Sequence, residues 1–167
     1  MNTINSVIAK MMDYYKGDPK RIQHFIKVYQ FGKLIGEEEG LDADKQRILE
    51  TACVVHDIGI KVSEEKYHSS AGNYQELEGP PIARSLLTSF DYSLEEIDRI
   101  CWLVGHHHTY KNIEGADYQI LVEADFLVNA WEDGLSREAV ESVRKKIFAT
   151  AAGIRMFETM YKVDLFL

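Results

Sequence analysis

Apolar residues recur every three or four positions along most of this chain, which is the spacing of one face of a helix. Strand signals are almost absent, because no run alternates Val, Ile or Thr between Asn-Gly or Asp-Gly turns. The pattern therefore predicts an all-α fold with more than half of the residues in helices. We expect a single-domain helical bundle over 1–167, with the motifs in a core at about 20–132 and C-terminal helices at about 136–162.

Glycines, prolines and helix caps divide this pattern into elements. Ser93 followed by Glu96 predicts a capping box at the start of one helix. Residues 61–81 are polar and predict a long loop, which ends where Pro80-Pro81 opens the next helix. The expected helices lie at about 3–16, 19–39, 43–57, 81–89, 94–105, 118–132 and 136–162, the last bent at Gly153.

The helix that contains the apolar run 48–55 ends in an adjacent His56-Asp57 pair, and Gly59 follows almost at once. Gly59 indicates a helix break, where a left-handed or close-packed backbone is tolerated. A histidine and a carboxylate at the end of a buried helix need partners, and a divalent metal satisfies both. The alternative is a hydrogen-bonded core histidine beside an exposed aspartate.

Two further polar residues lie on apolar helix faces. His24 belongs to an apolar stripe, one turn after Arg21, and Asp125 lies in the middle of a helix that is apolar nearly all round. Buried carboxylates are rare unless they are paired or bound to a metal. The alternative for Asp125 is a salt bridge, for instance with Arg21. Together with the His56-Asp57 pair, these residues favour a metal site.

This ordered set resembles the HD superfamily of metal-dependent phosphohydrolases. The matching residues are His24, His56-Asp57 in Val-Val-His-Asp-Ile-Gly, and Asp125 in Val-Glu-Ala-Asp, and the resemblance covers about residues 20–132. It implies a helical bundle of the HD-domain type in which these four side chains hold one divalent transition metal. Fe, Mn, Co, Ni and Zn all suit such ligands.

The resemblance also indicates where a second metal could bind. Two-metal relatives add histidines between the His-Asp pair and the last Asp, where this chain has His106, His107 and His108. Our candidates are His106 and His107, either as ligands or as donors to a phosphate. Such relatives carry another histidine before the helix at 81, and here Glu76 or Glu78 could replace it, or the second site is lost.

A phosphohydrolase of this kind implies attack by a metal-activated water. We expect Asp57 to be both a ligand and the carboxylate nearest to that water. Arg21 and Lys61 lie close in sequence to the ligands and are expected to neutralise the substrate phosphate. Lys111 and Arg84 could do the same, or could be solvated surface charges.

The net charge of −8 argues against nucleic acid and anionic membranes as partners. Cys53 and Cys101 lie in apolar helical patterns and predict buried free thiols, and neither a signal peptide nor a membrane span is evident, so we expect a cytoplasmic protein. The expected substrate is a nucleotide or another small phosphorylated metabolite. Two alternatives remain: a di-iron HD-fold oxygenase, and a non-catalytic nucleotide-binding regulatory domain.

Overall fold

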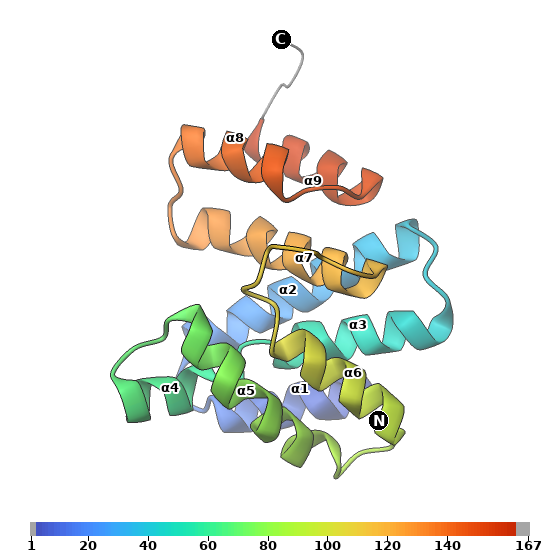
Figure 1. Cartoon of the computed structure of the whole chain (residues 1–167), viewed down its shortest axis with the longest axis vertical. Helices are drawn as coiled ribbons and strands as arrows, with labels where there is room; N and C mark the ends of the chain where they lie inside the picture. Colours follow the sequence, from blue (N-terminus) through green and yellow to red (C-terminus); the bar gives the residue numbers. More distant parts are fainter. Residues whose placement is uncertain (1–2, 163–167) are drawn as a thin grey trace.

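The computed structural model describes residues 3–162, and all regular secondary structure in that range is helical, as expected. Figure 1 shows how the helices are arranged. Their bounds are α1 Thr3–Tyr14, α2 Pro19–Glu38, α3 Ala43–Val55, α4 Ile60–Tyr67, α5 Gly72–Leu87, α6 Leu94–Val104, α7 Ala116–Glu132, α8 Arg137–Lys146 and α9 Ala151–Tyr161.

Helices α2, α3 and α7 form the centre of the molecule, because each packs against the other two. Helix α7 is apolar nearly all round, and this composition matches its position between α2 and α3 on one side and α9 on another. Its fully buried side chains include Ile120, Leu121, Val122, Ala124 and Leu127. A polar side chain on α7 therefore lies in the core unless it points out at an end.

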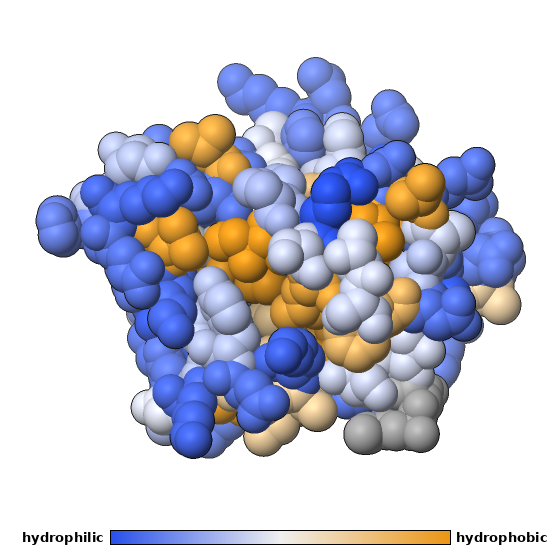
Figure 2. All heavy atoms as spheres, turned by 90° about the horizontal axis from the view of Figure 1, so that it is seen from below, coloured by the Kyte–Doolittle hydropathy of each residue, from blue (hydrophilic) through white to orange (hydrophobic). Residues whose placement is uncertain are grey.

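Helices α1, α5 and α6 lie at the end of the molecule opposite α8 and α9 (Figure 1). Viewed from that end, apolar side chains gather toward the middle of the surface and polar ones surround them (Figure 2). Large exposed hydrophobic residues on these three helices include Met12, Leu77 and Leu94. Among residues 3–162, no helix combines the length and the apolar character needed to cross a membrane.

The expected loop at 61–81 is wrong, because α4 and α5 occupy this region. Pro80 and Pro81 lie inside α5 rather than at the start of a helix. The polar residues that indicated a loop, among them Lys61, Lys66 and Glu76, lie on exposed or half-buried faces of α4, which has 8 residues, and α5, which has 16. These helices are formed by packing of α4 on α5 and of α5 on α6, which local sequence does not reveal.

The capping box is confirmed: the Ser93 hydroxyl accepts from the Glu96 N–H at 3.2 Å, and the Glu96 carboxylate accepts from the Ser93 N–H at 2.7 Å. The C-terminal region, in contrast, is broken at 147–150 rather than bent at Gly153. Gly153 lies in the first turn of α9, where the Thr150 hydroxyl accepts from its N–H at 3.0 Å.

A buried carboxylate from α7 determines where α9 begins. The Glu123 carboxylate accepts hydrogen bonds from the N–H groups of Ala149 and Thr150, at 2.6 and 2.9 Å, and from the Thr150 hydroxyl at 2.5 Å. A Cβ atom at Gly153 would collide with this carboxylate, so the glycine is needed for the close approach. Glu123 thus attaches the C-terminal helices to the central helix.

Candidate metal centre

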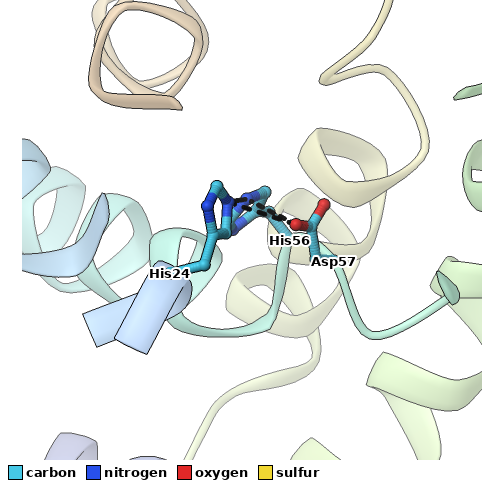
Figure 3. Close-up of side chains that lie close together, drawn as sticks. All are labelled: His24, His56 and Asp57. Atoms are coloured by element: carbon cyan, nitrogen blue, oxygen red, sulfur yellow. Dashed lines mark hydrogen bonds and ion pairs between the residues drawn. The ribbon is translucent and has the colours of Figure 1, made fainter. Parts of the chain in front are cut away.

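Four side chains from three helices converge in the core. His24 comes from α2, His56 and Asp57 from the end of α3, and Asp125 from the middle of α7. His24 Nε2 lies 3.2 Å from each of His56 Nε2, Asp57 Oδ2 and Asp125 Oδ1. Figure 3 shows His24, His56 and Asp57 pointing toward one another.

The two carboxylate oxygens near His24 also lie near His56 Nε2, with Asp57 Oδ2 at 3.4 Å and Asp125 Oδ1 at 3.3 Å. His56 is fully buried, and His24 and Asp125 are 6% and 3% exposed. His24, His56 and Asp57 form a group that could hold a metal ion, and Asp125 Oδ1 lies within 3.3 Å of both histidine nitrogens. Two imidazole nitrogens and two carboxylate oxygens are a donor set suited to a first-row divalent metal. The residues present therefore fit such an ion.

Three neighbouring residues that the sequence analysis missed hold these side chains in place. The Tyr15 hydroxyl donates to the Asp57 backbone carbonyl at 2.6 Å, and the Asn129 amide donates to Asp125 Oδ1 at 2.9 Å. Glu132 Oε2 lies 3.0 Å from His24 Nδ1. Asn129 and Glu132 follow Asp125 by four and seven residues, so helical spacing could have indicated them.

A second group of side chains shares Asp57. His107 Nε2 lies 3.3 Å from Asp57 Oδ1, and Asp57, His107 and His108 together could hold a metal ion. His107 is fully buried, and its Nε2 has no hydrogen-bond partner among the described residues. A buried nitrogen that faces a carboxylate oxygen at 3.3 Å without a hydrogen bond to it is well placed to share a bound ion with that oxygen.

His106 does not join this group. Its ring stacks on Trp102 with the centroids 4.0 Å apart, and its Nδ1 lies 2.7 Å from the Trp102 carbonyl. Consecutive side chains in a helical turn point in different directions, so His107 faces the centre while His106 faces away. The expectation that His106 accompanies His107 in the centre is therefore wrong, and His108 takes that place.

Glu76 and Glu78, the two carboxylates that could replace the missing histidine of a second metal site, have other partners. Glu76 Oε1 accepts from the N–H of His108 at 3.0 Å and from the Thr109 hydroxyl at 2.9 Å, which holds the histidine turn against α5. Glu78 accepts from Lys66 and from the hydroxyl of Tyr67. In the described part of the chain, neither belongs to a group that could hold a metal.

A cavity of about 200 Å³ opens onto His24 and Asp57. Its wall includes Lys20, which the sequence analysis missed, and Arg21, whose guanidinium pairs with Asp18 at 2.7 Å and with Glu64 at 2.5 Å. The other lining residues are Ile60, Ser70, Asn129, Glu132 and Asp133. The centre is thus accessible from one side, past two basic residues.

The remaining basic candidates lie farther from the centre. Lys61 is exposed over the Tyr14 ring and lines a second cavity, which shares Arg21 with the first. Arg84 pairs with Asp98 at 2.5 Å on the surface, and Lys111 is exposed. Arg21 and Lys20 are therefore the basic side chains that border the cavity at His24.

The family model of the HD domain matches residues 21–151, which is most of the chain and includes all four converging residues. The chain belongs to the HD domain family. An uncharacterized protein of Clostridium beijerinckii is 30% identical over 106 residues, a match that covers 64% of this chain and 62% of that relative.

A solved HD-family structure has the same fold. It is the crystal structure of a predicted HD superfamily hydrolase from an uncultured Thermotogales bacterium. The similarity covers 95% of this chain and 84% of that one, with a TM-score of 0.69 and 20% sequence identity. The all-α fold of the HD-domain type, expected from the resemblance, is thereby confirmed.

The four converging residues form what we call the HD centre: His24, His56, Asp57 and Asp125. They strongly shift one another's pKa values. Burial alone would lower the pKa of His24, but hydrogen bonds to Asp125 and Asp57 outweigh it and raise the pKa to about 11. Burial likewise opposes the charges of Asp57 and Asp125 at His56, whose pKa rises to about 10. Although burial would raise the pKa of both carboxyl groups, the facing imidazoles hold the pKa of each well below its usual range.

Metal binding to the HD centre is therefore expected to release protons. His24 and His56 face each other across two carboxylates, so at neutral pH at least one carries a proton that an entering metal displaces. Raising the pH lowers the proton concentration and so weakens this competition. We expect the apparent affinity for Mn²⁺ or Co²⁺ to rise about tenfold or more per pH unit between pH 6 and 8.

Isothermal titration calorimetry in buffers of different ionisation enthalpy measures this proton release directly. At least one proton per metal should appear at pH 7. A histidine with an ordinary pKa of about 6.5 would leave the affinity nearly constant above pH 7. An affinity without pH dependence, with no proton released, would contradict the raised pKa values.

Proposed function

We propose that this HD-family protein is a metal-dependent phosphohydrolase that acts on a nucleotide or another small phosphorylated metabolite. The observation that carries the proposal is the convergence of His24, His56, Asp57 and Asp125 beside a cavity bordered by basic side chains. When bound, a divalent metal acts as a Lewis acid and lowers the pKa of water toward about 7.

The chain's own residues have separate roles in this proposal. His24, His56, Asp57 and Asp125 would hold the ion, and Asp57 would be the carboxylate closest to the attacking water and able to accept its proton. Lys20 and Arg21 attract the phosphate electrostatically. Arg21 is already paired with two carboxylates, whereas no ion pair among residues 3–162 involves Lys20. We therefore assign Lys20 the larger share of this attraction, because Lys61 and Lys111 do not line this cavity.

One observation favours an alternative with two metals. Asp57 presents Oδ2 to His24 and His56, and presents Oδ1 to His107. A carboxylate in this arrangement could bridge two ions, the second held with His107 and His108. A pair of irons at these positions would suit the di-iron oxygenase reaction.

One experiment separates the functions. The protein is purified without a His tag, stripped by chelation, and restored with Mn²⁺, Co²⁺, Zn²⁺ or Fe²⁺ in turn under anaerobic conditions. We expect phosphate release from at least one member of a panel of nucleotides and sugar phosphates, restored by Mn²⁺ or Co²⁺. Turnover that needs dioxygen and returns only with iron would establish the oxygenase instead.

A protein that binds metal and nucleotide without turning over any substrate would be the regulatory domain.

Both cysteines are buried free thiols, which supports the expectation of a reducing compartment.

A further inference from the structure

The histidines of the centre are oriented in two different ways. His56 Nδ1 lies 2.7 Å from the Cys53 carbonyl, and His107 Nδ1 lies 2.8 Å from the Val104 carbonyl. In both cases the partner is a backbone carbonyl three residues earlier, so the local turn alone directs Nε2 into the centre. The Nδ1–H of each ring donates to a neutral acceptor.

His24 is different, because its Nδ1 faces a carboxylate from another helix. Glu132 lies 108 residues away in sequence, at the end of α7, and its Oε2 is 3.0 Å from His24 Nδ1. The second oxygen of Glu132 lies 2.5 Å from Lys27 Nζ. The side chain of Glu132 is only 13% exposed, and both of its oxygens have partners, so its position is well defined.

The spacing along both helices explains this contact. Lys27 follows His24 by three residues on α2, and Glu132 follows Asp125 by seven residues on α7, so each pair shares one helix face. Helix α7 therefore presents Asp125 to Nε2 of His24 and Glu132 to Nδ1 of the same ring.

We infer that Glu132 is a positioning residue that orients His24 and strengthens it as a metal ligand. A carboxylate at Nδ1 keeps the proton on that nitrogen, which leaves the lone pair of Nε2 for the ion and makes the ring more electron-rich. Lys27 in turn holds Glu132 in place. The inference rests on the proposed metal centre, but it does not depend on which reaction the centre catalyses.

The test measures metal affinity rather than turnover. The full chain is prepared as wild type, Glu132→Gln and Glu132→Ala, and Co²⁺ binding is followed by competition with a chelator and by the Co²⁺ absorption spectrum. Glutamine can still accept from Nδ1 but has no charge, whereas alanine removes the hydrogen bond as well. We expect the affinity to fall about 10-fold for Glu132→Gln and up to about 100-fold for Glu132→Ala.

Asp133→Asn is the matched control. Asp133 is the next residue, lines the same cavity and carries the same charge, yet no hydrogen bond or ion pair in the described part of the chain joins its side chain to His24. We expect its Co²⁺ affinity to stay within about threefold of wild type. A comparable loss in Asp133→Asn would mean that general cavity charge, and not Glu132, sets the affinity, which would overturn the inference.

The thermal shift produced by Co²⁺ distinguishes positioning from a merely structural role. A structural role would lower the melting temperature equally with and without metal, whereas loss of affinity reduces the shift itself. A reduced shift in Glu132→Gln supports the inference. If the wild type binds Co²⁺ and both Glu132 variants bind it with the same affinity, the role of Glu132 is overturned while the metal centre stands. Failure of the wild type to bind any of Mn²⁺, Co²⁺, Zn²⁺ or Fe²⁺ overturns the metal centre and this inference with it.

Discussion

Replacing Asp57 with Ala is expected to abolish both metal retention and phosphate release. Asp57 presents one oxygen to His24 and His56 and the other to His107, so no other side chain can take over both contacts. The substitution also leaves the Nε2 atoms of His24 and His56 with a single facing carboxylate among these four residues, Asp125. We expect metal affinity to weaken by more than the roughly 100-fold that loss of a supporting residue causes.

Metal content after desalting, measured by elemental analysis, and phosphate release test this expectation. Asp57→Asn keeps the shape of the side chain but not its charge, and we expect it to lose activity as well. Asp13→Ala, which removes an exposed carboxylate from α1, is the control and should match wild type. A folded Asp57→Ala protein that retained one metal and full turnover would refute the role of Asp57.

The second large effect is expected at Gly59, for steric reasons. Its φ of −76° is open to any residue, so the glycine is not there for a left-handed backbone. A Cβ atom at this position would lie 2.7 Å from the Gln75 carbonyl oxygen and 2.9 Å from the Gly79 nitrogen, both in the backbone of α5. Backbone atoms within a helix cannot move aside singly, so Gly59→Val must displace α5 from the turn after Asp57.

We expect Gly59→Val to lower the free energy of unfolding by about 3 kcal/mol or more, the upper range for overpacking. Urea denaturation monitored by circular dichroism measures this change. Gly40→Ala is the control. A φ of +74° strains the backbone of an alanine, but no atom lies within 4 Å of the added Cβ. That strain costs only about 1–2 kcal/mol. Equal losses in the two variants would contradict the steric explanation.

Periodicity was sufficient to predict the all-α fold, because core-facing stripes on α2, α6 and α7 are evident locally. The same reasoning placed His24 and Asp125 on buried faces, where the structure brings them within 3.2 Å of each other. Chemistry-bearing side chains on apolar faces are conspicuous in a sequence, because burial of such groups needs a partner.

Features that depend on packing between helices could not be predicted in this way. α4 and the part of α5 before Pro81 have exposed polar faces, and their helical form depends on contacts of α4 with α5 and of α5 with α6. Which of three consecutive histidines faces the core depends on the turn after α6, and this turn is held by Glu76 from α5. Tyr15 reaches the Asp57 carbonyl from the turn after α1, 42 residues earlier, a contact that no local pattern encodes.

The attachment of α9 to Glu123 has a consequence for the order in which the chain matures. Asp125 is the last of the four converging residues to be synthesised. Ala149 and Thr150, which donate to Glu123, are synthesised more than twenty residues later. Before those residues are made, the Gln119 amide, which donates to Glu123 Oε1 at 2.8 Å from the same helix, is the one donor of this set that is present. Burying the Glu123 carboxylate without most of its hydrogen bonds costs on the order of several kcal/mol. We therefore expect the core around α7 to close only after the chain has grown past Thr150, so that any metal held there would be taken up late in folding.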